Sequence, residues 1–201
     1  MYKYIIITWP GVQYLLIGEN LCTGIVKVNQ MEVKYRTIGV IHSPFTRKDE
    51  TPIQGVFSDA KGTVEVFPEY ADGLKDIEGF SHLFLIYHFS QAEGYTLTQK
   101  PFMDGSKERG IFAIRHYNRP NPIGMSIVEL KGVRGNVLEI SGVDVLDGTP
   151  LLDIKPYVRQ FDCREGVRSG WVDEQQAEPG ERRSYTPKGL EKSDAGQSRR
   201  G

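Results

Sequence analysis

Residues 80–89 read FSHLFLIYHF, and they form the most apolar stretch in the middle of the chain. Both faces of an extended chain over this stretch are apolar, and the stretch is rich in aromatic residues. This composition is typical of a central strand covered on two sides. We therefore predict that residues 80–89 are the core strand of the fold.

Shorter strand patterns flank this core strand. Val64 and Val66 alternate with polar residues, which is the period of a half-buried strand. Arg134-Gly135-Asn136 supplies hairpin-turn residues between two later patterns, and residues 71–79 fit one or two helical turns. The expected strands are residues 35–42, 62–67, 80–89, 111–115, 125–133 and 137–140.

Many short strands, separated by glycine and proline and with almost no helical periodicity, indicate a mostly β protein. A small barrel and a sandwich both fit, and we predict a small β barrel with short helical connections. The chain has no Gly-x-Gly-x-x-Gly after a predicted strand, so the sequence does not support a Rossmann fold.

Composition bounds the class of protein. Hydrophobic residues make up 39% and charged residues 25% of the chain, which is ordinary for a soluble globular protein. The formal net charge of −1 gives no global basic field, so a nucleic-acid partner would need a local patch. Cys22 and Cys163 follow no metal-ligand spacing, so no metal site or disulfide framework is expected.

Location and domain limits follow from similar observations. No apolar run is long enough to span a membrane, and the start of the chain lacks a signal-peptide cleavage pattern, so we expect a cytoplasmic protein. Residues 1–30 are either an N-terminal extension or an added hairpin. Residues 31–173 form the predicted barrel domain. Residues 174–201 are polar and are expected to be a disordered tail.

Two segments combine rigid turn formers with charged groups, and neither is a usual strand sequence. They are residues 115–126, RHYNRPNPIGMS, and residues 144–157, DVLDGTPLLDIKPY. In the first, Pro120 and Pro122 stiffen the chain and Gly124 permits a close approach to the backbone. The alternative is that these segments are well-built connections with solvated charges.

Taken together, these segments resemble the TrmO family, also called YaeB-like or TsaA-like proteins. The same order is kept by IGVIHSPF (38–45), PIQGVFSDAKGTVEVFPEY (52–70), FSHLFLIYHF and GIFAIRHYNRP (110–120). The resemblance covers residues 35–157. It implies a small β barrel that binds S-adenosylmethionine (SAM), forms a homodimer and methylates tRNA at N6 of N6-threonylcarbamoyladenosine 37.

The resemblance also implies a set of cofactor contacts. Gly55 allows a close backbone approach, Gln91 can donate and accept hydrogen bonds, Arg115 can pair with the methionine carboxylate, and Asp144 can accept from ribose hydroxyls or the ammonium group. The alternative is that Gly55 only turns the chain and that Met125 fills the core. The full set is Gln54, Gly55, Val56, Gln91, Ala92, Arg115, Met125, Ser141, Gly142, Val143 and Asp144.

A general base and an RNA surface are less well defined by the sequence. The candidate bases are Asp147, Asp153, Lys155 and Tyr157, and the sequence does not choose among them. The four histidines are not expected to be catalytic, and His82 and His88 are expected to be packed within the core strand. A basic rim for tRNA phosphates is expected from Arg119, Lys155, Arg159, Arg164 and Arg168, with Tyr117 or Tyr157 stacking on a base.

Two alternative functions stay open. One is methylation of another nucleic acid or a small molecule on the same scaffold. The other is a non-catalytic barrel that binds RNA or a nucleotide. SAM binding without methyl transfer to tRNA would favour the first alternative, and absence of SAM binding would favour the second.

Overall fold

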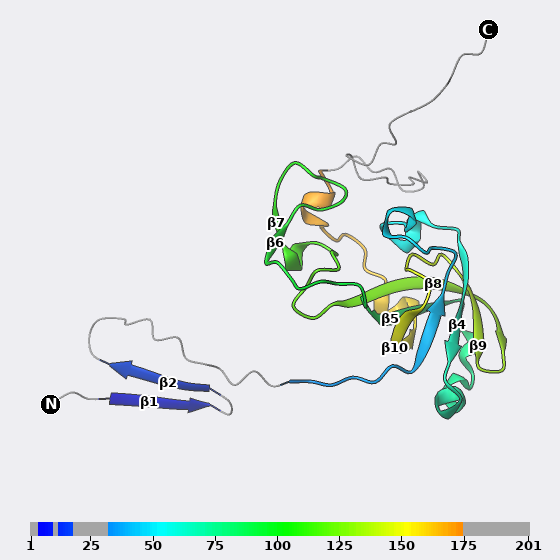
Figure 1. Cartoon of the computed structure of the whole chain (residues 1–201), viewed down its shortest axis with the longest axis horizontal. Coiled ribbons are helices and arrows are strands. Elements are labelled where there is room, and N and C mark those ends of the chain that lie inside the picture. Colours follow the sequence, from blue (N-terminus) through cyan, green and yellow to red (C-terminus); the bar gives the residue numbers. More distant parts are fainter. Residues whose placement is uncertain (1–3, 10–11, 18–31, 175–201) are drawn as a thin grey trace, which may run out of the picture. The chain divides into compact units, whose positions relative to one another are not determined.

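The computed structural model describes residues 4–9, 12–17 and 32–174. The chain divides into two compact units, Met1–Tyr35 and Arg36–Gly201. In the first unit, β1 (Tyr4–Trp9) and β2 (Val12–Ile17) pair as an antiparallel hairpin (Figure 1). The assignment of residues 1–30 as an added element or an extension stays a prediction. The expected tail, apart from Glu174, lies outside the described residues.

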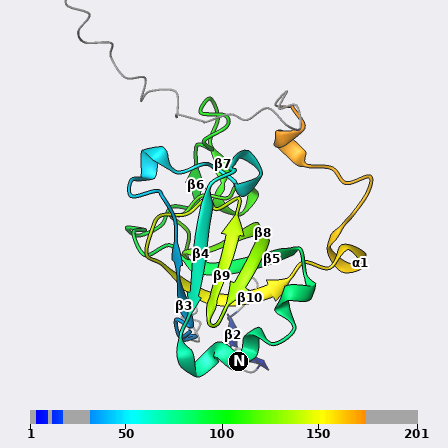
Figure 2. The same cartoon turned by 90° about the vertical axis from the view of Figure 1, so that its right-hand side faces the viewer.

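Six antiparallel strands close into a barrel in the second unit, in the order β10-β3-β4-β9-β8-β5 (Figure 2). This confirms the predicted mostly β fold with a small barrel. The strands are β3 (Gly39–His42), β4 (Lys61–Val66), β5 (His82–His88), β8 (Ile123–Arg134), β9 (Val137–Ser141) and β10 (Thr149–Pro156).

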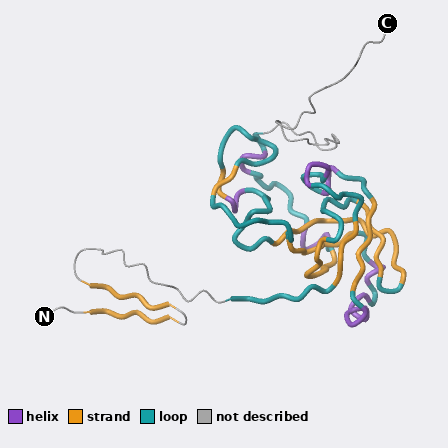
Figure 3. The backbone as a smooth tube through the Cα atoms, in the orientation of Figure 1, coloured by secondary structure: helices purple, strands orange, loops and turns teal. Residues whose placement is uncertain are grey.

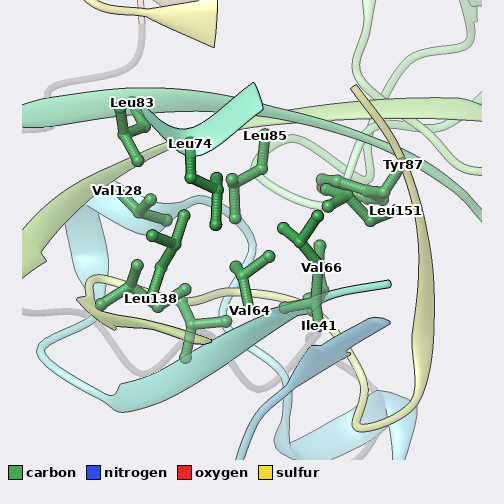
Figure 4. Packing of buried hydrophobic residues seen from close by; sticks show 13 residues of the cluster. Ile41, Val64, Val66, Leu74, Leu83, Leu85, Tyr87, Val128, Leu138 and Leu151 are labelled. Carbon is green, nitrogen blue, oxygen red and sulfur yellow. The ribbon is translucent and has the colours of Figure 1, made fainter. Parts of the chain in front are cut away.

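The interior of the barrel is filled by alternate side chains of its strands. On β5, Leu83, Leu85 and Tyr87 are buried, while Phe84 and Ile86 on the outer face are only half-buried. Coverage of residues 80–89 on two sides is therefore wrong, because a sheet closed on itself needs one fully buried face. Figure 4 shows these inner side chains packed against those of the other strands, including Ile41, Val64, Val66, Val128, Leu138 and Leu151.

The connections consist mostly of loops and turns, with short helices and one small ladder within them (Figure 3). β6 (Thr98–Gln99) pairs with β7 (Arg109–Gly110) in the long β5–β8 connection. The helices are η1 (Lys48–Glu50), η2 (Gly55–Phe57), η3 (Pro68–Leu74), η4 (Ile77–Gly79), η5 (Ile111–Ala113), α1 (Arg159–Asp162) and η6 (Gly170–Val172). None of the helices among the described residues is long and apolar enough to cross a membrane.

Two expected elements differ in the structure. Residues 111–115, expected as a strand, contain η5. Ile111 at its start and Ile114 directly after it are buried, and Phe112 between them is exposed. Burial at a spacing of three suits a 3-10 turn better than a strand.

Residues 144–157, not expected to form a strand, contain β10, which closes the barrel between β3 and β5. Thr149 and Leu151 point inward, and Pro150 lies between them.

Candidate functional site

One end of the barrel carries the loops that contain Gln54, Gln91, Arg115 and Asp144. Because neighbouring strands are antiparallel, the chain leaves β3, β5 and β9 and enters β4, β8 and β10 at the same end. The connections at this end are residues 43–60, 89–122 and 142–148. Segments far apart in the sequence therefore meet around one opening.

Two neighbouring cavities lie among these loops. The smaller, of about 150 Å³, is bounded by residues of all three connections, with Gln91, Ala92, Arg115 and Asp144 among them. The larger, of about 620 Å³, has Gln54, Val56 and several aromatic side chains in its wall. The two cavities share Ile53, Phe102 and Arg115 in their walls. The cavities are therefore two compartments of one site.

The polar wall of the smaller cavity centres on Asp144. Ser126 on β8 donates a hydrogen bond from Oγ to Oδ1 of Asp144 at 2.5 Å, and the hydroxyls of Ser126 and Tyr87 lie 2.9 Å apart. Burial raises the pKa of Asp144 to about 6, against the lowering effects of the Ser126 hydroxyl, the Gly55 backbone amide and Arg115. Asp144 is thus a carboxyl group poised to titrate near neutral pH.

Gly55 brings the η2 backbone close to the β9–β10 connection. A Cβ atom built on Gly55 would lie 2.7 Å from the carbonyl oxygen of Gly142 and 3.2 Å from that of Ile127. Any other residue would push η2 away from these carbonyls. The missing side chain is what allows the Gly55 amide to reach Asp144.

Arg115 and Lys48 supply positive charge at the opening. The Nη1 atom of Arg115 donates to Oε1 of Gln54 at 2.6 Å. Lys48 donates to the carbonyl oxygen of Gln91 at 3.0 Å, and its Nζ lies 5.0 Å from the ring centroid of Tyr117. These contacts join residues 43–60 to residues 89–122 across the opening and leave further N–H groups of Arg115 available for an anionic ligand.

The remaining residues of the expected cofactor set line neither cavity. Met125 is on the outer face of β8, with 47% of its surface exposed. Ser141 ends β9, Gly142 has a φ of +84°, and Val143 is buried. The structure thus gathers Gln54, Val56, Gln91, Ala92, Arg115 and Asp144 in the cavity walls and places Gly55 beside Asp144, whereas the other four residues do not line a cavity.

The four candidate bases also lie outside the two cavities. Asp147 binds Nδ1 of His42 at 3.1 Å. Asp153 and Lys155 form an ion pair of 2.7 Å, and Tyr157 packs against Phe84, all three toward the opposite end of β10. The carboxylate that faces the smaller cavity from this part of the chain is that of Asp144.

The histidines and Arg119 differ from expectation. His88 is exposed and His82 half-buried, because both lie at the ends of β5. His116 is the buried histidine, and its ring stacks on those of Phe102 and Tyr117 at ring-centroid distances of 5.0 and 4.3 Å. Burial lowers the pKa of His116, and the nearby charge of Arg119 lowers it further.

Arg119, expected to point outward toward RNA, is half-buried and donates to the carbonyl oxygen of Ile114 at 2.9 Å. The other residues of the predicted basic rim, Lys155, Arg159, Arg164 and Arg168, are exposed.

Trp171 is a residue of the site that the sequence did not reveal. Its indole Nε1 donates to the carbonyl oxygen of Ala113 at 2.8 Å, and the guanidinium of Arg109 lies 5.2 Å from the indole ring centroid. Trp171 forms part of the wall of the larger cavity. In the part of the chain that the structure describes, no cluster of three or more acidic, histidine or cysteine side chains is arranged to hold a metal ion.

The protein is thus a closed antiparallel β barrel whose candidate ligand site is built from the loops at one end. Residues 40–163 match the family model of the tRNA-methyltransferase O N-terminal domain, and the chain belongs to this TrmO family. Sequence comparison and structural comparison agree on this assignment.

Individual relatives carry names that describe related activities. A probable S-adenosyl-L-methionine-binding protein of Pyrococcus abyssi is 57% identical over 140 residues, 69% of this chain and 76% of that protein. The tRNA (adenine(37)-N6)-methyltransferase of Escherichia coli is 40% identical over 135 residues, 62% of this chain and 57% of the enzyme. A crystal structure of TrmO superimposes with a TM-score of 0.62 at 38% identity, covering 70% of this chain and 64% of the other. This chain therefore spans less than two thirds of the E. coli enzyme and of the TrmO in the crystal structure.

Proposed function

We propose that this protein is a SAM-dependent tRNA methyltransferase that acts on N6 of adenosine 37, and that its substrate is N6-threonylcarbamoyladenosine. Besides family membership, one observation of the structure supports the proposal. Residues that the family resemblance assigns to the cofactor come from three separate connections and meet around the paired cavities.

The chemistry of these side chains suits SAM. The cofactor carries a carboxylate, an ammonium group, a sulfonium cation and ribose hydroxyls. Arg115 pairs with the carboxylate as a charge-assisted donor, and Asp144 accepts from the ammonium group or a ribose hydroxyl. Gln91, which also lines the smaller cavity, can donate and accept toward adenine or the amino-acid group.

Methyl transfer breaks the S–CH₃ bond of SAM and forms an N6–CH₃ bond on the nucleoside. S-adenosylhomocysteine leaves with the electron pair of the broken bond, and the N6 proton must be lost to a base or to water. Because the methyl group is already activated, the protein contributes mainly in-line placement of N6. The larger cavity, with its aromatic wall, adjoins the cofactor compartment and is the place for the nucleoside.

The same proposal includes a cytoplasmic homodimer. The outer face of β8 exposes Ile123, Met125 and Ile127 at 37%, 47% and 44% of their surface. A second copy covering this apolar row would bury it and would bring Met125 into an interface. Sedimentation velocity with and without SAM measures the oligomeric state.

The decisive experiment compares two tRNA substrates. Purified protein and SAM are incubated with tRNA that carries threonylcarbamoyl on adenosine 37 and with the matched unmodified transcript, and the nucleosides are analysed by mass spectrometry. We expect a mass increase of one methyl group only on the modified nucleoside. Equal methylation of both tRNAs would reject the substrate, SAM binding without transfer would indicate another acceptor, and absence of SAM binding would indicate a non-catalytic barrel.

A further inference from the structure

The hydroxyl groups of Tyr87 and Ser126 lie together in the largely apolar interior of the barrel, below the cofactor compartment. Tyr87 on β5 is 4% exposed and Ser126 on β8 is 6% exposed. Their oxygens are 2.9 Å apart, and Ser126 Oγ is 2.5 Å from Oδ1 of Asp144. The three side chains therefore form a continuous hydrogen-bonded chain from the barrel interior to the wall of the smaller cavity.

Asp144, at the cavity end of this row of hydrogen bonds, determines which group donates at each step. An ionised Asp144 can only accept, so Ser126 must use its single proton toward the carboxylate. The Ser126 oxygen is then the acceptor for the Tyr87 hydroxyl. Burial, followed by the charge of Asp144, raises the pKa of Tyr87 far above its ordinary value, which keeps this donor protonated.

The sequence makes specific room for this arrangement. In the β5–β8 pairing, Tyr87 lies opposite Gly124, two residues before Ser126 on the same inner face. A Cβ atom on Gly124 would overlap the rings of Tyr87 and Phe89. The Gly-Met-Ser segment of β8 thus admits the tyrosine ring at its glycine and receives the hydroxyl at its serine.

We propose that Tyr87 and Ser126 are positioning residues that hold the Asp144 carboxylate in its ionised form and in the orientation that receives SAM. The proposal rests on the function proposed above, in which this cavity binds SAM. A carboxylate in this half-buried place is disfavoured by desolvation, and charge-assisted donors offset that cost. Oδ1 accepts from Ser126, and the backbone amides of Gly55 and of Asp144 itself also donate to this carboxylate, which leaves its remaining acceptor positions for the cofactor.

A purely structural role predicts something different. Two buried hydroxyls need partners wherever they lie, so removing one could lower stability without altering Asp144. The two roles separate when the titration of Asp144 is followed, because only a positioning role changes the pH at which the carboxylate forms. Arg115 acts on Asp144 by its charge, and Lys48 and Asp49 line the same cavity, so a variant that removes the titrating group is needed as reference.

The experiment measures SAM affinity by calorimetry from pH 5 to pH 8.5 for wild type, Tyr87→Phe, Ser126→Ala and Asp144→Asn. The control is Ser43→Ala, which removes a hydroxyl bonded to the Val145 backbone carbonyl at the same end of the barrel. We expect wild-type affinity to fall as the pH drops through about 6. Ser126→Ala should move that midpoint upward and weaken SAM about tenfold at pH 7, as for loss of a hydrogen bond to a charged group.

Tyr87→Phe keeps the ring and should move the midpoint in the same direction by a smaller amount. Asp144→Asn should abolish this pH dependence, and adding Ser126→Ala to it should change SAM affinity little. Ser43→Ala should keep the wild-type midpoint. A ¹³C titration of the Asp144 carboxyl in the cofactor-free protein gives the same midpoints independently of SAM.

The outcomes separate the two proposals. Unchanged midpoints in both hydroxyl variants, with SAM bound by the wild type, would overturn the positioning role and leave the proposed function intact. A wild type that binds no SAM at any pH would overturn both. If Ser126→Ala does not fold, the carboxyl titration of Tyr87→Phe still distinguishes a positioning role from a structural one. Tyr87→Phe removes only the hydroxyl and keeps the ring packed against Gly124.

Discussion

The Arg115 guanidinium donates to the side-chain oxygen of Gln54 at 2.6 Å, and this bond joins the segment after η5 to the residue that directly precedes η2. Both side chains line the larger cavity, and Arg115 also lines the smaller one. Because the guanidinium has five N–H groups in a fixed plane, Gln54 can orient Arg115 while other N–H groups remain available to a carboxylate. We therefore propose that Gln54 acts on SAM in part by orienting Arg115.

Arg115→Ala is expected to weaken SAM binding by about 1.5–3 kcal/mol, the range for hydrogen bonds to charged groups. Gln54→Ala should have a smaller effect, and the double variant should lose less than the sum of the two. Arg115→Lys should not restore affinity, since a lysine lacks the planar pair of donors. Calorimetric titration of the four proteins checks this, and normal SAM binding by Arg115→Ala would remove the arginine from the cofactor site.

Arg119→Ala is expected to destabilise the protein at the connection between β5 and β8. The Arg119 side chain is half-buried and donates to the Ile114 carbonyl, so its removal leaves a backbone acceptor without its partner. We expect a loss of about 1–2 kcal/mol in the free energy of unfolding, measured by urea denaturation. The salt dependence of tRNA binding should stay unchanged. An unaltered stability together with a salt slope reduced by about one counterion would instead make Arg119 a phosphate contact.

Much of the barrel could be predicted because its strands keep a period of two. Val64 and Val66 on β4 alternate with polar residues in the sequence and are buried in the structure. The turn at Gly135, with a φ of +60°, was likewise expected from its residue types. The strand β10 was missed because Pro150 interrupts the pattern, and its pairing with both β3 and β5 is set by closure of the barrel.

The site was predictable only where the family resemblance supplied the residues. Local sequence does not show that Ser126, in the middle of a strand, reaches Asp144 in a loop 18 positions later. We expected the Arg119 side chain to point into solvent because Asn118 and Pro120 flank it in the sequence. In the structure this side chain instead donates to the Ile114 carbonyl. Trp171 had no pattern to mark it, because its partners Ala113 and Arg109 are brought to it only by tertiary structure.

Asp144→Asn is expected to stabilise the protein in a pH-dependent way while weakening SAM binding. The pKa of Asp144 is raised from 3.8 to about 6, so the folded protein binds more protons than the unfolded chain between these values. Stability contributed by this group therefore falls as the pH rises from about 4 to about 6. Replacing the carboxyl group removes that loss.

The gain for Asp144→Asn should approach an upper limit of about 3 kcal/mol above pH 6, at about 1.4 kcal/mol for each pKa unit, and should vanish below pH 4. Thermal unfolding of wild type and variant from pH 4 to pH 8 measures it. A gain that is equal at all pH values would show that desolvation of the Asp144 charge is not its source.

Trp171 is expected to anchor the segment after α1 to the η5 turn. Trp171→Ala removes the hydrogen bond to Ala113 and the contact with Arg109, and we expect a loss of about 1–2 kcal/mol in unfolding free energy. Trp171→Phe keeps a ring and should lose less. SAM affinity should change little, because Trp171 contacts Ala113 and Arg109, which are outside the expected cofactor set.

Two shortened chains test the contribution of Trp171 without a point substitution. A chain that stops after Glu174 retains Trp171 and should melt at the temperature of the full chain, since residues 175–201 offer few apolar side chains to bury. A chain that stops after Arg168 should melt at the lower temperature of Trp171→Ala. Differential scanning calorimetry compares the four proteins. If the chain ending at Arg168 melts with the full chain, the contacts of Trp171 contribute nothing to stability, and its role is confined to the cavity wall.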